Sequence, residues 1–260
     1  MILGFDIGNS NTVLGVYTGK EHLPAAAYRY RTLRDASADE TGALVRQFLL
    51  HHDEAAGEVK GVVFSSVVPE LNRAYHEMSG RYFGLRALEI SHRSRLSIRI
   101  RYDDPSRLGV DRIVNAEAAF HEYARDCIIV DIGTAITFCV LHADGFYDGG
   151  SIGPGIGVTI DALSSKASQL PRIAFEKPER LVARNTEDAL KSGFFYGWLS
   201  CVEGMVARIR DEYRKQFLVI LTGGYSGTVL APALRGEVVV DQMLTMKGIR
   251  RIYDLNAASM

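Results

Sequence analysis

A strand–turn–strand pattern occurs twice in this chain, once near the start of each half. An apolar run at residues 2–5 leads into Asp-Ile-Gly-Asn, and a second run at 127–130 leads into Asp-Ile-Gly-Thr. The two aspartates, Asp6 and Asp131, are 125 residues apart (131 minus 6) in a chain of 260. Self-similarity at such an interval indicates two similar structural halves.

Strand and helix patterns follow each other through both halves. Apolar spacing predicts helices from about residue 39, over 109–123, from about 185 and over 242–253. Strands are expected at 61–68, 146–150 and 217–221, and a glycine-rich loop at 149–157. This mixture indicates an α/β protein. We place the boundary between the halves near residue 115, which gives domains 1–115 and 116–260.

Composition excludes several classes of protein. With 30 basic and 31 acidic residues the net charge is -1, which gives no electrostatic footprint for nucleic acid or an anionic membrane. The three cysteines form no Cys-x-x-Cys pair, so neither a disulfide framework nor a cysteine-rich zinc site is expected. The first residues lack a basic segment, and no apolar run reaches the roughly 20 residues of a membrane span. We therefore expect a cytoplasmic protein.

The common phosphate-loop and zinc-protease motifs are absent. The sequence contains no Gly-x-x-x-x-Gly-Lys-Ser/Thr loop and no His-Glu-x-x-His. The glycines at 153–157 are too closely spaced for the Gly-x-Gly-x-x-Gly fingerprint of dinucleotide-binding proteins. If the chain binds a nucleotide, other residues must hold its phosphates.

The repeated Asp-x-Gly turns supply such residues. A phosphate chain needs several donors in a concave space, and the first turn offers the flexible backbone of Gly8 with polar side chains at 9–12. Asp6 can hold a hydrated Mg²⁺. The second turn would supply the facing half of the phosphate site, with Asp131, Gly133 and Thr134. Either turn alone is equally explained as an ordinary hairpin rich in Asp, Gly and Asn. The two together, with Thr-Gly-Gly at 222–224, favour phosphate binding.

A third motif is Gly-Val-Asp-Arg at residues 109–112. Asp111 beside Arg112 is explained either as an ion pair at a helix start or as a functional pair. In the functional case the carboxylate accepts the proton of a substrate hydroxyl, as a kinase requires. The arginine then binds an anionic substrate or the transferring phosphoryl group.

The ordered set of motifs resembles the type III pantothenate kinase family. The matching segments span nearly the whole chain and lie at 6–12, 108–113, 130–137, 153–157, 185–186, 222–224 and 244–248. The resemblance implies two ribonuclease-H-like domains of the actin-like ATPase type and a homodimer. It also implies ATP-dependent phosphorylation of pantothenate, the first step of coenzyme A biosynthesis, with Mg²⁺ and a monovalent cation, K⁺ or NH₄⁺.

The same resemblance suggests roles for individual residues. Asp111 would be the proton acceptor, Asp131 the monovalent-cation ligand and Asp6 a ligand of Mg²⁺. The ATP-binding residues would be Asp6, Ile7, Gly8, Asn9, Ser10, Asn11, Thr12, Val13 and Thr134. The substrate-binding residues would be Tyr102, Gly109, Val110, Asp111, Arg112 and Thr186. Tyr102 and Thr186 are also explained as a half-buried tyrosine and a helix-start residue, and the role of Tyr225 stays open.

Two other functions fit the same motifs. One is a different phosphotransferase or a phosphohydrolase on the same duplicated scaffold, because a fold alone does not fix the substrate. The other is a regulatory accessory protein that binds nucleotide without turnover. Asp111 distinguishes an enzyme from a protein that only binds nucleotide, since the latter has little need of a carboxylate in the Gly-Val-Asp-Arg segment.

Overall fold

A computed structural model describes residues 1–50, 58–224 and 229–257, and its chain forms two compact units. Unit 1 comprises Met1–His121 and Met243–Met260, and unit 2 comprises Glu122–Gln242. This division differs from the one expected at residue 115, because the C-terminal helix packs with the first half of the chain. Tyr225 lies outside the described residues.

The sheet of unit 1 has five strands in the order β3-β2-β1-β4-β5. Their bounds are β1 (Ile2–Ile7), β2 (Asn11–Tyr17), β3 (Ala26–Arg31), β4 (Gly61–Ser66) and β5 (Leu88–Glu89). The central strand β1 runs antiparallel to β2 and parallel to β4. The first Asp-x-Gly turn therefore lies at the end of the central strand, as the sequence predicts.

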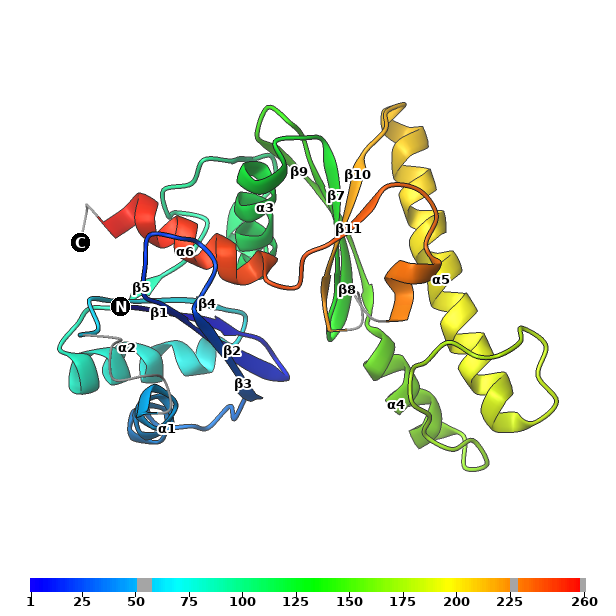
Figure 1. Cartoon of the computed structure of the whole chain (residues 1–260), viewed down its shortest axis with the longest axis horizontal. Coiled ribbons are helices and arrows are strands. Elements are labelled where there is room, and N and C mark those ends of the chain that lie inside the picture. Colours follow the sequence, from blue (N-terminus) through cyan, green and yellow to red (C-terminus); the bar gives the residue numbers. More distant parts are fainter. Residues whose placement is uncertain (51–57, 225–228, 258–260) are drawn as a thin grey trace. The chain divides into compact units, whose positions relative to one another are not determined.

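Helices cover both faces of this sheet (Figure 1). On one face lie α1 (Ala38–Leu50) and α2 (Pro69–Phe83), and on the other lies α6 (Leu244–Asn256). The alternation along β4 explains why both are needed: Val62 and Phe64 pack with α1 and α2, whereas Val63 packs with α6 and with α3 (Val110–Tyr123). A strand that is apolar on both sides must be covered on both sides.

The last helix, α6, belongs with unit 1 because of its apolar stripe. Met246, Ile249 and Ile252 lie three residues apart and pack in one cluster with Val63. Tyr17 adds a hydrogen bond of 2.6 Å from its hydroxyl to the carbonyl oxygen of Met246. Sequence order alone assigned this helix to the second half, but its stripe is buried by the first.

Unit 2 repeats the arrangement with strands in the order β11-β10-β7-β8-β9. Their bounds are β7 (Cys127–Ile132), β8 (Ala135–Leu141), β9 (Phe146–Pro154), β10 (Leu218–Gly223) and β11 (Val238–Val240). Again the central strand, β7, runs antiparallel to one neighbour and parallel to the other. The predicted duplicated α/β fold is thus confirmed.

One expectation for unit 2 was wrong. The glycine-rich segment at 149–157 was predicted as a loop, yet β9 extends to Pro154 and pairs with β8 as far as Ala135. A register shift between Cys139 and Leu141 and the positive φ angles of Gly149 and Gly150 (87° and 155°) let the strand continue. Such an irregularity is a β-bulge, for which glycine is well suited.

Two helices of unit 2 pack on its sheet, α4 (Ile156–Lys166) and α5 (Thr186–Tyr213). Phe195, Val202 and Val206 of α5 join the core formed by β7, β8 and β10. Asn185 caps α5 as predicted, because its side-chain oxygen accepts the N–H of Asp188 at 2.9 Å. None of the helices in the three described ranges has the length and hydropathy needed to cross a membrane.

The described residues also include three other short elements. They are β6 (Arg99–Ile100) and two 3₁₀ turns at Pro105–Arg107 and Ala231–Ala233. The first two belong to the segment that leads to the Gly-Val-Asp-Arg motif.

Candidate functional site

The two Asp-x-Gly turns occupy matching places in their units. Asp6 pairs with Val13 across the first hairpin, and Asp131 pairs with Thr137 across the second. Strands β1 and β7 are offset by 125 residues, whereas β2 and β8 are offset by 124 (135 minus 11). The second turn is therefore one residue shorter than the first.

The first turn is closed by hydrogen bonds from within it and from Thr32, the residue that follows β3. The Gly8 amide donates to the Asn11 carbonyl at 3.1 Å, and the Thr32 amide donates to the Ser10 carbonyl at 3.1 Å. The Thr32 hydroxyl also donates to the Gly8 carbonyl at 2.7 Å. These bonds leave the side chains of Asn9, Ser10 and Asn11 exposed to solvent.

Thr12 does not offer its hydroxyl as the sequence predicts. It is 1% exposed, and its hydroxyl is 2.9 Å from that of Thr32. Side chains alternate along a strand, so Thr12 at the start of β2 points inward while Asn11 points outward. Ile7 is also fully buried. Among the eight predicted ATP-binding residues of this turn, the exposed polar side chains are those of Asn9, Ser10 and Asn11.

The second turn is closed by a bond from the start of α4. The Gly133 amide donates to the Ala135 carbonyl at 3.0 Å, and the Gly155 amide donates to the Thr134 carbonyl at 2.9 Å. Gly155 directly precedes α4, so the positive end of this helix lies at the turn. Gly133 and Thr134 are exposed. The geometry favours a negatively charged ligand here.

Gly223 makes room for the carboxylate of Asp131. A Cβ atom at Gly223 would lie 2.6 Å from Asp131 Oδ1 and 2.6 Å from the Ile132 carbonyl oxygen, and its φ of +85° also favours glycine. Carboxylate and carbonyl oxygens are the ligands that hard cations prefer, and they fit a monovalent cation or Mg²⁺ equally. Within the described ranges, no three His, Cys, Asp or Glu side chains gather as a metal-ligand cluster.

Asp111 lies in the first turn of α3, where its Oδ1 accepts the Arg112 amide at 2.9 Å. Burial raises the pKa of the Asp111 carboxyl above its usual range, and the amide and charge of Arg112 offset part of that rise. A Cβ atom at Gly109 would lie 2.5 Å from Asp111 Oδ1, so glycine at this position leaves room for the carboxylate. A carboxylate with a raised pKa is a better proton acceptor than an ordinary one.

The predicted substrate-binding residues of unit 1 lie together. Arg112 is 4% exposed, and its guanidinium carbon lies 6.0 Å from the ring centre of Tyr102, which is 36% exposed. Gly109, Val110 and Asp111 precede Arg112 directly. Thr186 is exposed at the first position of α5 and is described with unit 2.

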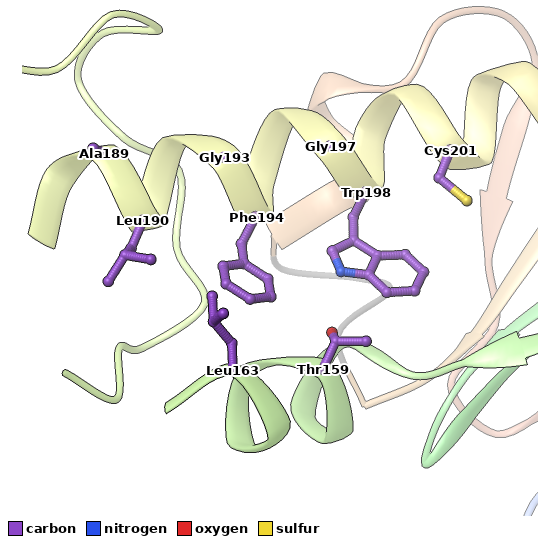
Figure 2. Close-up of a pocket in the computed structure, with 9 residues that line it drawn as sticks. All are labelled: Thr159, Leu163, Ala189, Leu190, Gly193, Phe194, Gly197, Trp198 and Cys201. Atoms are coloured by element: carbon purple, nitrogen blue, oxygen red, sulfur yellow. The ribbon is translucent and has the colours of Figure 1, made fainter. Parts of the chain in front are cut away.

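An apolar groove of about 430 Å³ runs between α4 and α5 (Figure 2). Figure 2 shows Leu190, Phe194 and Trp198 of α5 pointing toward Leu163 and Thr159 of α4. The remaining lining residues are Ala189, Gly193, Gly197 and Cys201.

Sequence reasoning missed Thr32 and Gly155, which hold the two turns in shape. Thr32 follows β3 directly, and the only signal was a hydroxyl residue near the end of the strand that neighbours the first turn. Gly155 lies in a segment whose glycines were noticed but were interpreted as a loop. In both cases the contact joins residues about 20 apart, which no local pattern reports.

Duplicated sheets, each with an Asp-x-Gly turn at the end of its central strand, define the actin-like ATPase fold. A solved structure with the same fold is the activator of the 2-hydroxyisocaproyl-CoA dehydratase from Clostridium difficile with bound ADPNP. It has a TM-score of 0.57 at 14% identity, covering 99% of this chain and 95% of that chain.

Within that fold class the chain belongs to the type III pantothenate kinase family, whose family model matches residues 2–208. A type III pantothenate kinase from Brevibacillus brevis is 44% identical over 256 residues, covering 98% of this chain and 99% of the relative. Another, from Bacillus cytotoxicus, is 39% identical over 257 residues, covering 99% of this chain and 97% of the relative.

Proposed function

We propose that this protein transfers the γ-phosphoryl group of ATP to pantothenate, giving ADP and 4′-phosphopantothenate. Its membership of a kinase family named for this substrate carries the proposal, and the arrangement around Asp111 supports it. The reaction is the first step of coenzyme A biosynthesis. ATP, pantothenate and Mg²⁺ are the substrates and the metal ion that this activity requires.

Asp111 is the proton acceptor. The primary hydroxyl oxygen of pantothenate bonds to the γ-phosphorus as the bond from that phosphorus to the β–γ bridging oxygen breaks. The hydroxyl proton passes to the Asp111 carboxylate. The transition state of phosphoryl transfer is loose, so aiming the hydroxyl matters as much as removing its proton. The Arg112 amide, at 2.9 Å from Asp111 Oδ1, fixes the carboxylate for both tasks.

Arg112 and Tyr102 hold the rest of the acceptor substrate. Pantothenate carries a carboxylate, and a buried guanidinium is a strong partner for such a group. The ring of Tyr102 lies beside that guanidinium and limits where it can point. Gly109 and Val110 contribute backbone, and the exposed Thr186 hydroxyl is a further contact.

The two turns hold ATP and the cations. Residues 6–13 and Thr134 bind the phosphates, with Asn9, Ser10 and Asn11 as side-chain donors in the first turn. Asp6 and Asp131 offer oxygen ligands of the type that Mg²⁺ and K⁺ prefer. We assign Mg²⁺ to Asp6 and the monovalent cation, K⁺ or NH₄⁺, to Asp131. When bound, Mg²⁺ neutralises charge on the phosphate oxygens.

The test is ADP release by purified protein with ATP, Mg²⁺ and K⁺, with and without pantothenate. We expect release to depend on pantothenate and a phosphorylated product to be found by mass spectrometry. Equal release without pantothenate would indicate a phosphohydrolase or another acceptor, and no release would favour a binding protein.

We also infer that the protein acts as a homodimer in the cytoplasm. The apolar groove between α4 and α5, whose lining residue Leu163 is 37% exposed, is a surface suited to a second copy of the chain. Light scattering should give the mass of two chains, and Phe194→Ser should weaken the association. A fully active monomer would contradict the assembly.

A further inference from the structure

Glu117 is a charged residue in the buried middle of α3. It lies on α3 among Val114, Ala116 and Ala118, and it is 0% exposed. Burying a carboxylate is costly unless donors surround it. The donors here are backbone amides of a separate segment: Ser97 at 3.0 Å and Ile98 at 3.2 Å, both to Oε2.

A histidine supplies a third donor. His121 Nε2 lies 3.1 Å from Glu117 Oε1 and 2.9 Å from the Ser97 hydroxyl. Its other nitrogen, Nδ1, lies 2.6 Å from Arg251 Nη2. A guanidinium can only donate, so Nδ1 must accept, and the proton of a neutral imidazole then lies on Nε2. The carboxylate is thereby held by two amides and an imidazole.

The hydrogen bonds to Glu117 fix the backbone of the segment that precedes Tyr102. Residues 97 and 98 lead directly into β6 (Arg99–Ile100), and Tyr102 follows two residues later. Beyond it, Asp104 Oδ1 accepts the Ser106 amide at 3.0 Å and starts the 3₁₀ turn that leads to Gly109. Tyr102 therefore lies in a short segment anchored at both ends, with its ring beside Arg112.

We propose that Glu117 is a positioning residue for the acceptor substrate. It acts through the backbone of Ser97 and Ile98 to hold Tyr102 against Arg112. Because α3 carries both Asp111 and Glu117, the same rigid helix positions the proton acceptor and the segment that faces it. The inference rests on the proposed function, which makes Tyr102 and Arg112 the binding residues for pantothenate.

The test is Glu117→Gln, which keeps the shape but places an amide NH₂ among N–H donors. We expect the KM for pantothenate to rise about 10–100-fold, the same range as when the partners that support metal ligands are removed. We expect kcat and the KM for ATP to stay within about threefold of wild type. His121→Asn, which removes one donor of three, should raise the same KM by less.

The control is Val45→Ala on α1, which destabilises the core of unit 1 without changing residues 97–102. It should lower Tm and leave both KM values unchanged. If Glu117→Gln behaves like Val45→Ala, Glu117 only stabilises the fold and the proposal is wrong. An equal change in both KM values would also overturn it.

A second measurement does not depend on the substrate. Hydrogen exchange over residues 96–103, and tryptic cleavage after the exposed Arg99 and Arg101, should accelerate in Glu117→Gln and not in Val45→Ala. Unchanged exchange there would overturn the anchoring role. If wild-type protein does not use pantothenate but this exchange still accelerates, the proposed function fails while the anchoring role of Glu117 stands.

Discussion

The two Asp-x-Gly turns come from the same pattern, yet they differ in what they present. The first has three exposed polar side chains, Asn9, Ser10 and Asn11, and is closed by the hydroxyl of Thr32. The second is one residue shorter and is closed by the Gly155 amide at the start of α4. One turn offers side-chain donors, and the other offers a helix terminus and the Asp131 carboxylate.

The difference shows how a repeated hairpin acquires two tasks. The paired strands and the aspartate are kept, because they place a carboxylate at the end of a central strand in both units. The residues after Asp-Ile-Gly differ, and so does the segment that closes the turn. We therefore expect the two turns to respond differently to the same substitution, and neither to respond like Asp111, which lies on a helix outside both hairpins.

The largest effect is expected at Asp111. Asp111→Asn keeps the size of the side chain but removes its charge and basicity, and general bases contribute about 10²–10⁴-fold. We expect a kcat loss in that range with the KM for ATP nearly unchanged, measured by ADP release. Asp103→Asn, an exposed neighbour, is the control and should behave as wild type. A kcat within a few-fold of wild type would remove Asp111 from the mechanism.

The two aspartates of the turns should give different losses. For Asp131→Asn we expect stimulation by K⁺ over Na⁺ to disappear, with activity lowered about 10–100-fold. For Asp6→Asn we expect a higher Mg²⁺ requirement with K⁺ stimulation retained. Titrating each cation at fixed ionic strength separates the two. Identical responses would mean that both turns perform one task, and wild-type turnover without any K⁺ requirement would remove Asp131 from the monovalent site.

A smaller effect is expected when the closing bond of the first turn is removed. Thr32→Val keeps the shape but loses the hydrogen bonds to Gly8 and Thr12. A bond of this kind contributes about 1 kcal/mol, so we expect the KM for ATP to rise about fivefold. Thr41→Val, also buried in unit 1, is the matched control. An unchanged KM would show that the turn keeps its shape without Thr32.

The fold and the position of Asp111 were predicted from the sequence, but the unit to which α6 belongs was not. The fold followed from the repeat and the apolar periodicities, because both report local burial. The position of Asp111 at the start of α3 followed in the same way. The assignment of α6 failed because an apolar stripe shows that a helix is buried but not which sheet buries it.

In the site, too, local patterns did not show which distant residues make contact. The exposed donors at 9–11 were predicted, but the contact between the buried Thr12 hydroxyl and that of Thr32, 20 residues away, was not. Glu117 was overlooked because its partners are the backbone amides of Ser97 and Ile98. Backbone amides occur in any sequence, so the residue types do not reveal the contact. A charged residue inside an apolar helical run is the signal that was available, since it must find donors when buried.

The smallest expected effect concerns stability, and its sign tests the environment of Asp111. Burial raises the pKa of this carboxyl in the folded protein above its ordinary value of 3.8. Between the unfolded and the folded pKa, the folded state then binds more protons than the unfolded state. Stability therefore falls as pH rises through this window. The ionised carboxylate is a cost to folding at neutral pH.

Asp111→Asn removes that cost, so the difference in Tm between variant and wild type should move in favour of the variant as pH rises from about 4 to 7. Each kcal/mol of this cost corresponds to about 2–4 °C in Tm for a chain of roughly this size. Thermal unfolding of both proteins across this range measures the difference. An aspartate stabilised by an ion pair would have a lowered pKa and would give the opposite slope. That result would support a structural role for Asp111. A catalytic role would be supported if kcat/KM falls at acid pH in the wild type and this fall is absent in Asp111→Asn.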